Sequence, residues 1–370
     1  MTTTTVARLR PPAGTDRVEG PFPGYHNVTY AVSPDAVSRP GLQFHRLKLR
    51  EPRPGVFWFD LRLFPSEDQL ISALQGCIPH IPPVAVIDDH MSTTVFIEGR
   101  TLGSLRSASG GRTVAAGFLD QIEELFQHLV ACDTARLPKE RLRLCTCDDL
   151  PRAESSTGFL RRVVHFTLEH VYAPHRERFS GLLADLDVRE DALSAFEGRL
   201  PELTPRSFRL LHGDLHCENF IVDSADALWT IDWELALIGD PLYDLATHLH
   251  LMRYPSAQRR EMIARWLRAV GEEAGRGAGE DLPHYLAYKR VQSVITDVIR
   301  GATGLDAALD YAQLGQVAAV VVRALRDAQE PLGLDKVPSR VAVEAAFEAW
   351  HSRHASPVTA GRGPSTWPGR

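Results

Sequence analysis

The sequence predicts an α+β fold with two lobes, a small β-rich N-terminal lobe and a larger, mainly helical C-terminal lobe. Apolar and polar residues alternate in short runs before residue 98, whereas apolar residues recur at helical spacing through most of the chain beyond it. A length of 370 residues suits two lobes and leaves little room for a third domain. We expect a loose arm at 1–18, the N-lobe at 19–98, the C-lobe at 99–355 and a disordered tail at 356–370.

The predicted N-lobe consists of strands separated by Pro- and Gly-rich turns, together with one helix. The helix follows Ser66, an N-cap with Gln69 at the capping-box position, and Leu70, Ile71 and Leu74 recur at helical spacing. Alternation and a richness in aromatic and β-branched residues predict the strands, at 28–32, 44–50, 56–64, 84–88 and 93–97.

The predicted C-lobe is helical on both sides of one β-segment. Amphipathic patterns at 118–130 and 159–171 precede that segment. No internal repeat and no sustained heptad is present, so the lobe is neither a solenoid nor a coiled coil. Five further helices are expected at 241–252, 257–274, 283–300, 307–328 and 340–350.

The composition argues against several classes of function. The net charge of −6 is unlike the basic surface of a nucleic-acid-binding protein. No apolar run approaches the ~20 residues that cross a bilayer, and the first ten residues lack the apolar segment of a signal peptide. Cys145 and Cys147 have no second pair at zinc-ribbon spacing. We therefore expect a cytoplasmic protein with reduced thiols and with no nucleic-acid or membrane partner; its oligomeric state is not predicted.

The most informative segment is His212-Gly213-Asp214-Leu215-His216-Cys217-Glu218-Asn219, which is followed by Ile231-Asp232-Trp233-Glu234. Each part follows an apolar strand. Phosphoryl transfer needs such a set: Asp214 would orient an acceptor hydroxyl and take its proton, and Asn219 and Asp232 would hold Mg²⁺ against a nucleoside triphosphate. The alternative is a β-hairpin in which Asp and Asn only form turns.

This pattern resembles the aminoglycoside phosphotransferase family and its choline-kinase-like relatives. The resemblance implies a protein-kinase-like fold, ATP or GTP as phosphoryl donor, Mg²⁺ as cofactor and a small-molecule hydroxyl as acceptor. The segment from Gly239 to Ala246 also fits the family. There Asp240 is a predicted N-cap before Pro241, and we expect Asp240 and Asp244 to shape the loop and the helix start rather than to bind metal.

The family also implies a phosphate-binding lysine that pairs with a helix glutamate. Only four of the 41 basic residues are lysine, and Lys48 is the one in the N-lobe, in the middle of a predicted strand. Its expected partner is Glu67, although Glu67 could simply be a first-turn acid that the helix dipole favours. Arg62 is the rival to Lys48, but only four residues separate it from Glu67.

Two further nucleotide contacts are expected by resemblance. Gly24 and Asn27 resemble the ends of the family's G-x-x-N loop, whose N–H groups would cap phosphate oxygens. The backbone of Phe96, Ile97 and Glu98 resembles the interlobe hinge, where adenine would bind. An ordinary turn before a strand would also explain the Gly24 loop.

The expected acceptor is an antibiotic of the aminoglycoside, nucleoside, peptide or macrolide type, or a related secondary metabolite. The segment 177–202, with seven acids against three arginines, would suit a polycationic substrate but could equally be a solvated face. A kinase of a primary-metabolism alcohol such as choline remains an alternative, as does a nucleotide-binding pseudokinase. A phosphohydrolase with His212, Asp214 and His216 as metal ligands is a third; it lacks the further His/Asp clusters of such sites.

Overall fold

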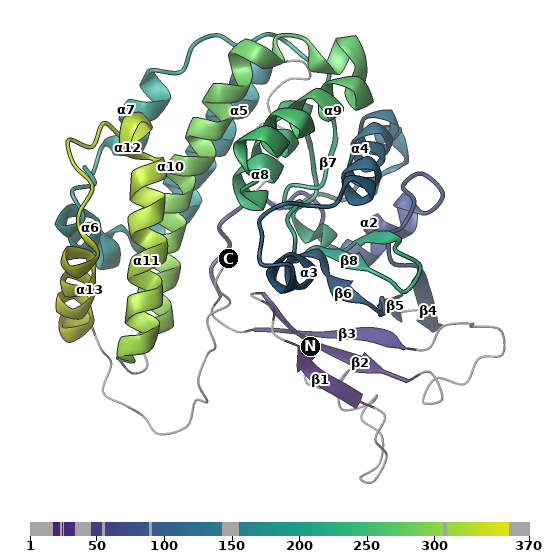
Figure 1. Cartoon of the computed structure of the whole chain (residues 1–370), viewed down its shortest axis with the longest axis horizontal. Coiled ribbons are helices and arrows are strands. Elements are labelled where there is room, and N and C mark those ends of the chain that lie inside the picture. Colours follow the sequence, from purple (N-terminus) through teal and green to yellow (C-terminus); the bar gives the residue numbers. More distant parts are fainter. Residues whose placement is uncertain are drawn as a thin grey trace. The chain divides into compact units, whose positions relative to one another are not determined.

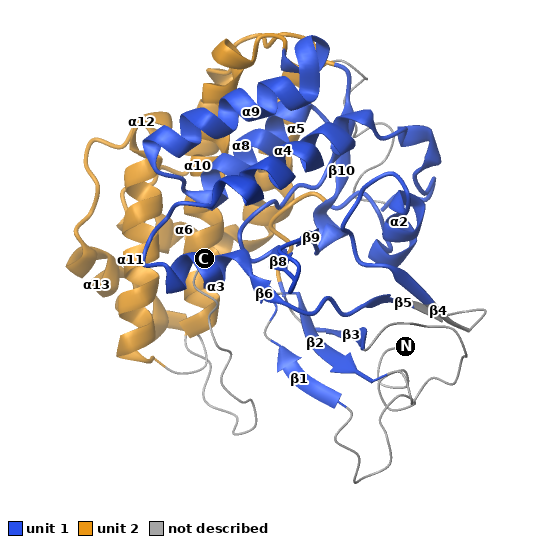
Figure 2. Cartoon of the chain, turned by 45° about the vertical axis from the view of Figure 1, so that its right-hand side comes forward, with its two compact units in different colours: residues 1–56, 62–146, 207–275 blue, residues 57–61, 147–206, 276–370 orange. Residues whose placement is uncertain are grey.

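Strands dominate the first part of the chain and helices the rest (Figure 1). The computed structural model describes residues 18–22, 24, 26–33, 46–53, 56–88, 91–142, 155–305 and 309–354. The predicted tail, most of the arm, and Cys145 and Cys147 lie outside these residues. By contacts the chain divides into two compact units, coloured in Figure 2: residues 1–56, 62–146 and 207–275 form unit 1, and residues 57–61, 147–206 and 276–370 form unit 2.

Unit 1 contains an antiparallel sheet of five strands in the order β1-β2-β3-β5-β4. The central strand β3 pairs with β2 through Ala31 and Lys48, and with β5 through Lys48 and Thr94. Helix α2 begins after Ser66, whose hydroxyl accepts a hydrogen bond from the Gln69 N–H as predicted. These elements are β1 (Val18–Phe22), β2 (Asn27–Val32), β3 (Leu47–Pro52), α2 (Glu67–Leu74), β4 (Val84–Asp88) and β5 (Met91–Val95).

The other described residues of unit 1 form short strands in two small sheets, ordered β6-β8-β9 and β10-β7, and four α-helices. Helix α4 packs against α9, and α8 also packs against α9. The bounds are β6 (Arg100–Thr101), α3 (Leu102–Ala108), α4 (Ala116–Ala131), β7 (Arg209–Leu211), β8 (Phe220–Val222), β9 (Leu228–Thr230), a 3-10 turn η5 (Trp233–Leu235), β10 (Leu237–Gly239), α8 (Pro241–Met252) and α9 (Ser256–Gly275).

The described part of unit 2 contains no strand. Helix α11 packs against both α10 and α13, and a Cβ at Gly301 of α10 would lie 2.5 Å from Val317 of α11, so only glycine permits this close approach. The helices are α5 (Ser156–Phe166), the π-helical turn η3 (Thr167–Tyr172), α6 (Arg176–Asp185), α7 (Ala192–Gly198), α10 (Ala278–Leu305), α11 (Tyr311–Asp327), α12 (Gln329–Leu332) and α13 (Arg340–His354).

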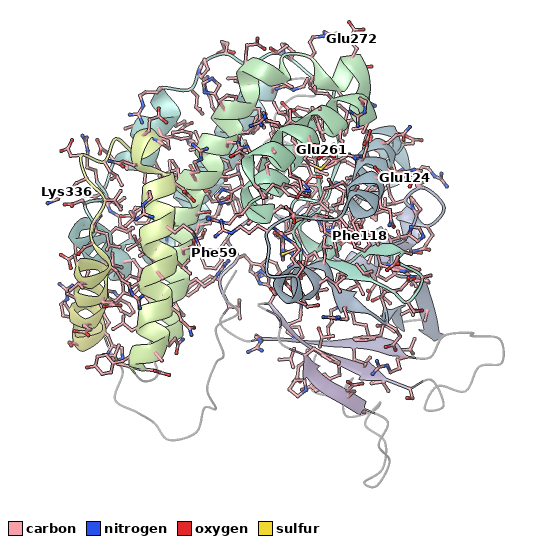
Figure 3. All side chains as sticks on the ribbon, in the orientation of Figure 1. Phe59, Phe118, Glu124, Glu261, Glu272 and Lys336 are labelled. Carbon is pink, nitrogen blue, oxygen red and sulfur yellow. The ribbon has the colours of Figure 1, made fainter. Side chains whose placement is uncertain are left out.

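The predicted strand at 56–64 is wrong. The segment is not in a sheet, and residues 57–61 belong to unit 2. Phe59, which is labelled in Figure 3, packs on a side chain of unit 2: the guanidinium of Arg300 lies 4.6 Å above its ring. Gln292 of α10 donates to the carboxylate of Asp60 at 2.7 Å. The β-forming residues thus serve contacts with helices instead of strand pairing.

The predicted α+β class with a β-rich first part and a helical remainder is confirmed. Helices α6 and α7 were not predicted, although Phe179, Leu182 and Leu183, the buried residues of α6, recur at helical spacing. Unit 1 continues through residue 98, so the lobe boundary at that residue stays a prediction. No helix in the described residues is long and apolar enough to cross a membrane.

Candidate active site

The predicted catalytic motif lies in a strand–loop–strand segment of unit 1. The apolar pair Leu210 and Leu211 is buried in β7, the polar loop follows, and β8 pairs antiparallel with β9 through Phe220 and Thr230. Next to that pair the Ile231 N–H donates to the Asn219 carbonyl at 3.0 Å. The pairing therefore brings the end of the loop beside the residues that precede Asp232.

The Asp214 carboxylate is held by two neighbours from its own loop. Asn219 donates its side-chain N–H to the Asp214 carbonyl at 2.9 Å and to Oδ2 at 3.2 Å. The Nε2 of His216 lies 3.3 Å from the same Oδ2, while His216 Nδ1 accepts from the Glu218 N–H. Since the amide nitrogen of Asn219 is used in this way, its Oδ1 is the atom available to a cation.

Asp244, a buried residue of α8, holds the backbone at the start of the loop 212–219. Its two carboxylate oxygens accept the backbone N–H groups of His212 and Gly213, each at 2.9 Å. Asp240 caps the same helix by accepting from the Leu242 N–H at 2.9 Å. The expectation that Asp240 and Asp244 shape the loop and the helix start is thus confirmed.

His212 supports the loop as a neutral side chain. Its ring is fully buried, and burial lowers the pKa of this imidazole to about 4. Nε2 lies 3.1 Å from the Ile231 carbonyl and Nδ1 accepts from the Asp214 N–H, which together specify the Nε2–H tautomer. Gly213 has a φ of +81°, and a Cβ there would lie 2.5 Å from the Leu235 carbonyl oxygen, so no other residue fits without strain.

Asp232 has a left-handed backbone, with φ 66° and ψ 64°, and precedes the fully buried Trp233. Such a conformation in a residue other than glycine is sustained only by surrounding contacts. The Trp233 indole N–H donates to the Thr230 carbonyl at 3.1 Å, and its ring lies 4.6 Å from that of His212. These contacts hold the Trp233 side chain and thereby the peptide bond that joins Asp232 to Trp233.

The oxygens of Asn219 and Asp232 fit Mg²⁺ by chemistry. Magnesium is a hard cation that proteins hold through one or two oxygen ligands, with water and substrate phosphates completing the octahedron. Among the described residues, no group of three or more His, Cys, Asp or Glu could hold a metal ion by itself. A set of two oxygens suits an ion that arrives with a triphosphate.

Glu67 pairs with Arg50, and not with Lys48 as expected. Lys48 and Arg50 are two residues apart on β3 and therefore share a face of the sheet. One arm of the Arg50 guanidinium forms an ion pair with Glu67, and the other contacts Asp68 at 2.8 Å. A guanidinium fork can bind two carboxylates at once, which an ammonium does less well.

Lys48 lies on the same face of β3 as Arg50, but its ammonium group is buried near the segment that contains Asp232. Burial lowers the pKa of its ammonium and the neighbouring Arg50 lowers it further, whereas Asp232 and Glu234 oppose the shift. Lys48 is thus within electrostatic reach of the Asp232 segment. For Arg62 too, burial lowers the pKa, while the nearby Glu234 carboxylate raises it. Arg50 is the functional candidate that sequence reasoning missed, although its spacing from Lys48 predicts that both share one face.

The Gly24 loop contacts the segment that contains Asp232. The Asn27 side chain donates to Glu234 at 3.4 Å, and the His26 ring lies 4.0 Å from the same carboxylate. Burial, and then the neighbouring Asp232, raise the pKa of Glu234 to about 7. Glu234 therefore connects the predicted phosphate loop to the predicted metal ligand.

At the predicted hinge, the backbone N–H of Phe96 donates to the Arg46 carbonyl at 3.0 Å. Arg46 also contacts the exposed Glu98 carboxylate at 2.6 Å and lies 4.7 Å above the Phe96 ring. The Phe96 N–H is therefore used inside the protein, and a nucleotide base at this hinge would depend on the backbone of Ile97 and Glu98.

Comparisons with known proteins identify the family of the chain. The model of the phosphotransferase enzyme family matches residues 24–282, which is more than half of the chain. The chain belongs to this family. Consequently it is a small-molecule phosphotransferase, as its motif predicts. No curated protein sequence matches the chain.

Solved structures of similar fold include two from the choline-kinase side of the family. A choline/ethanolamine kinase family protein from Mesorhizobium loti is 17% identical with a TM-score of 0.50, over 94% of this chain and 99% of that one. An ethanolamine kinase from Plasmodium vivax is 16% identical with a TM-score of 0.53, over 85% and 84%. At these identities the likeness is one of fold, and the predicted kinase-like fold is confirmed.

For this phosphotransferase the acid-rich segment 177–202 gives no evidence of a polycationic acceptor. Most of its acids are paired with basic side chains of unit 2, four arginines and one histidine. Five of the seven form such pairs: Asp185–Arg353, Glu190–Arg176, Asp191–Arg189, Glu197–His165 and Glu202–Arg161. The segment is therefore a solvated helical face whose charge is largely neutralised locally.

Proposed function

We propose that this phosphotransferase moves the γ-phosphoryl group of Mg·ATP to a hydroxyl of a small molecule, an antibiotic or a related secondary metabolite. In this proposal Asp214 is the catalytic carboxylate, Asn219 and Asp232 hold Mg²⁺, and Lys48 neutralises phosphate charge. Gly24, Asn27 and the backbone of residues 96–98 would contact the nucleotide.

The observation that carries the proposal is the arrangement around Asp214. One carboxylate oxygen is held by both Asn219 and His216, so the group has a fixed direction. Asp244 fixes the backbone that carries it. A preoriented carboxylate next to a free amide oxygen suits a reaction in which positioning and charge neutralisation matter more than strong base chemistry.

The residues divide the chemistry between them. Asp214 accepts a hydrogen bond from the acceptor hydroxyl and so aims the hydroxyl oxygen at the γ-phosphorus. It takes the hydroxyl proton as the new P–O bond forms, while the bond from the γ-phosphorus to the β,γ-bridging oxygen breaks and ADP leaves. When bound, Mg²⁺ would neutralise charge on the triphosphate. The Lys48 ammonium, which is in reach of the Asp232 segment, would stabilise charge on the phosphate oxygens.

The acceptor class is supported by the family and not by a recognised pocket. The local pairing of the acids at 177–202 removes the feature that favoured an aminoglycoside in particular. Hydroxylated nucleoside, peptide and macrolide antibiotics therefore belong in the test beside aminoglycosides, with choline and ethanolamine as rival acceptors.

The test is a screen of the purified chain with Mg·ATP and, separately, Mg·GTP against these acceptors, with products identified by mass spectrometry. We expect a gain of one phosphoryl group on a single class of antibiotic or related metabolite. Phosphorylation of choline or ethanolamine alone would replace the proposed acceptor. Nucleotide binding without transfer to any acceptor would favour a pseudokinase.

A further inference from the structure

The two oxygens of the Glu67 carboxylate have two different partners. One forms the ion pair with Arg50 of β3. The other accepts a hydrogen bond from the backbone N–H of Trp233 at 2.8 Å. Glu67 is only 7% exposed, so both contacts are made out of solvent, where a charge-assisted hydrogen bond is strong. Helix α2 thereby contacts the turn η5 that follows Asp232.

The Trp233 N–H belongs to the peptide that joins it to Asp232. The direction of this peptide is set by the ψ of Asp232 and the φ of Trp233. Asp232 has the left-handed backbone that most residues avoid, and such a conformation persists where neighbouring contacts impose it. Glu67 supplies one such contact at the N–H, and the buried Trp233 ring supplies others.

The pairing with Arg50 gives Glu67 a function other than that of aligning a lysine. The Arg50 guanidinium holds one Glu67 oxygen and also Asp68, and so fixes the start of α2 to strand β3. With that end fixed, the second Glu67 oxygen stays beneath the Trp233 N–H. The chain of contacts runs from β3 through α2 to the peptide bond of Asp232.

We propose that Glu67 is a positioning residue for the metal ligand Asp232, acting through the Trp233 N–H. It holds the left-handed backbone of Asp232, whose carboxylate would bind the ion. The inference rests on the proposed function, because it needs Asp232 to bind Mg²⁺. Partners one step removed from a metal commonly change metal affinity 10- to 100-fold when they are lost.

The test measures Mn²⁺, as a stand-in for Mg²⁺, by electron paramagnetic resonance on the full chain saturated with ADP. We expect E67A to weaken Mn²⁺ binding by about 10- to 100-fold. E67Q keeps a carbonyl oxygen for the Trp233 N–H and should remain within about threefold of the wild type. If E67A does not fold, E67D takes its place, because it keeps the charge but withdraws the oxygen from Trp233.

The matched control is D68A, which removes the other carboxylate on Arg50 and does not touch Trp233 in this structure. Unchanged Mn²⁺ binding in D68A, with loss in E67A, supports the inference. Equal loss in E67Q and E67A would overturn it, since the ion pair and not the Trp233 contact would then matter. Wild-type binding in E67A would overturn it too. Failure of the wild type itself to bind Mn²⁺, with no difference from D232A, would overturn the proposed metal site as well.

Discussion

Replacing Asp244 by alanine should destabilise the loop that carries Asp214, the proposed catalytic residue, by several kcal/mol. The carboxylate is 1% exposed and accepts two backbone N–H groups, from His212 and Gly213, both at 2.9 Å. Alanine leaves two buried donors unsatisfied. A hydrogen bond to a charged group contributes about 1.5–3 kcal/mol, so two of them amount to about 3–6 kcal/mol.

Two measurements check this magnitude. Urea unfolding gives the global loss of stability, and amide hydrogen exchange of the peptide around 210–219 gives the local one. The control is D240A, which loses a single N-cap bond to Leu242 and should cost about 1 kcal/mol. The reasoning would be refuted if D244A lost no more stability than D240A, or if loop protection in D244A matched that of the wild type.

Three further predictions follow from single features. His212 and His248 are buried and neutral, each with a pKa of about 4 against about 6.5 in the unfolded chain, so the native state binds fewer protons. The contribution of each histidine to the free energy of unfolding should be full above pH ~6.5 and should fall by about 3 kcal/mol towards pH ~4. H248Q should therefore reduce the dependence on pH of the free energy of unfolding measured in urea, and an unchanged dependence would contradict this. G213A should lose most activity and several kcal/mol of the free energy of unfolding, because the new Cβ meets the Leu235 carbonyl. The control G110A is also at positive φ but has open space around it, and should lose only about 1–2 kcal/mol in the same urea titration. Equal losses in the two variants would contradict the steric explanation. K48A should raise the apparent KM for ATP several-fold to a hundredfold in steady-state kinetics, as expected for the loss of a charged contact of about 1–3 kcal/mol. R62A should act mainly on stability. If the kinetics show the reverse, the phosphate-binding role belongs to Arg62.

The site could be predicted where its chemistry is local in the sequence. Asp214 and Asn219 are five residues apart on one loop, and the strand pairing that brings Asp232 near them needs only a short hairpin. Helix α8 was predicted at its observed bounds, because N-cap, proline and apolar spacing all agree there.

The wrong predictions concern residues whose structure depends on the side chains that they contact in the fold, far away in the sequence. The residues 56–64 have strand composition, but Phe57 and Phe59 pack on His175 and Arg300 within unit 2, and composition does not specify which surface covers them. Lys48 and Arg50 lie on the same face of β3, so the sequence leaves open which of them meets Glu67. The fork of Arg50, which reaches both Glu67 and Asp68, decides that choice in the folded chain.

The central claim is that Asp214 orients and deprotonates the acceptor hydroxyl. The most direct test is the single-turnover rate of phosphoryl transfer by D214N, with the acceptor identified in the screen, beside calorimetric binding of Mg·ADP. The account predicts a rate loss of about 10²–10⁴-fold or more with nucleotide affinity little changed, because the amide keeps the shape of the side chain but cannot take the proton. Transfer by D214N at close to the wild-type rate would contradict it.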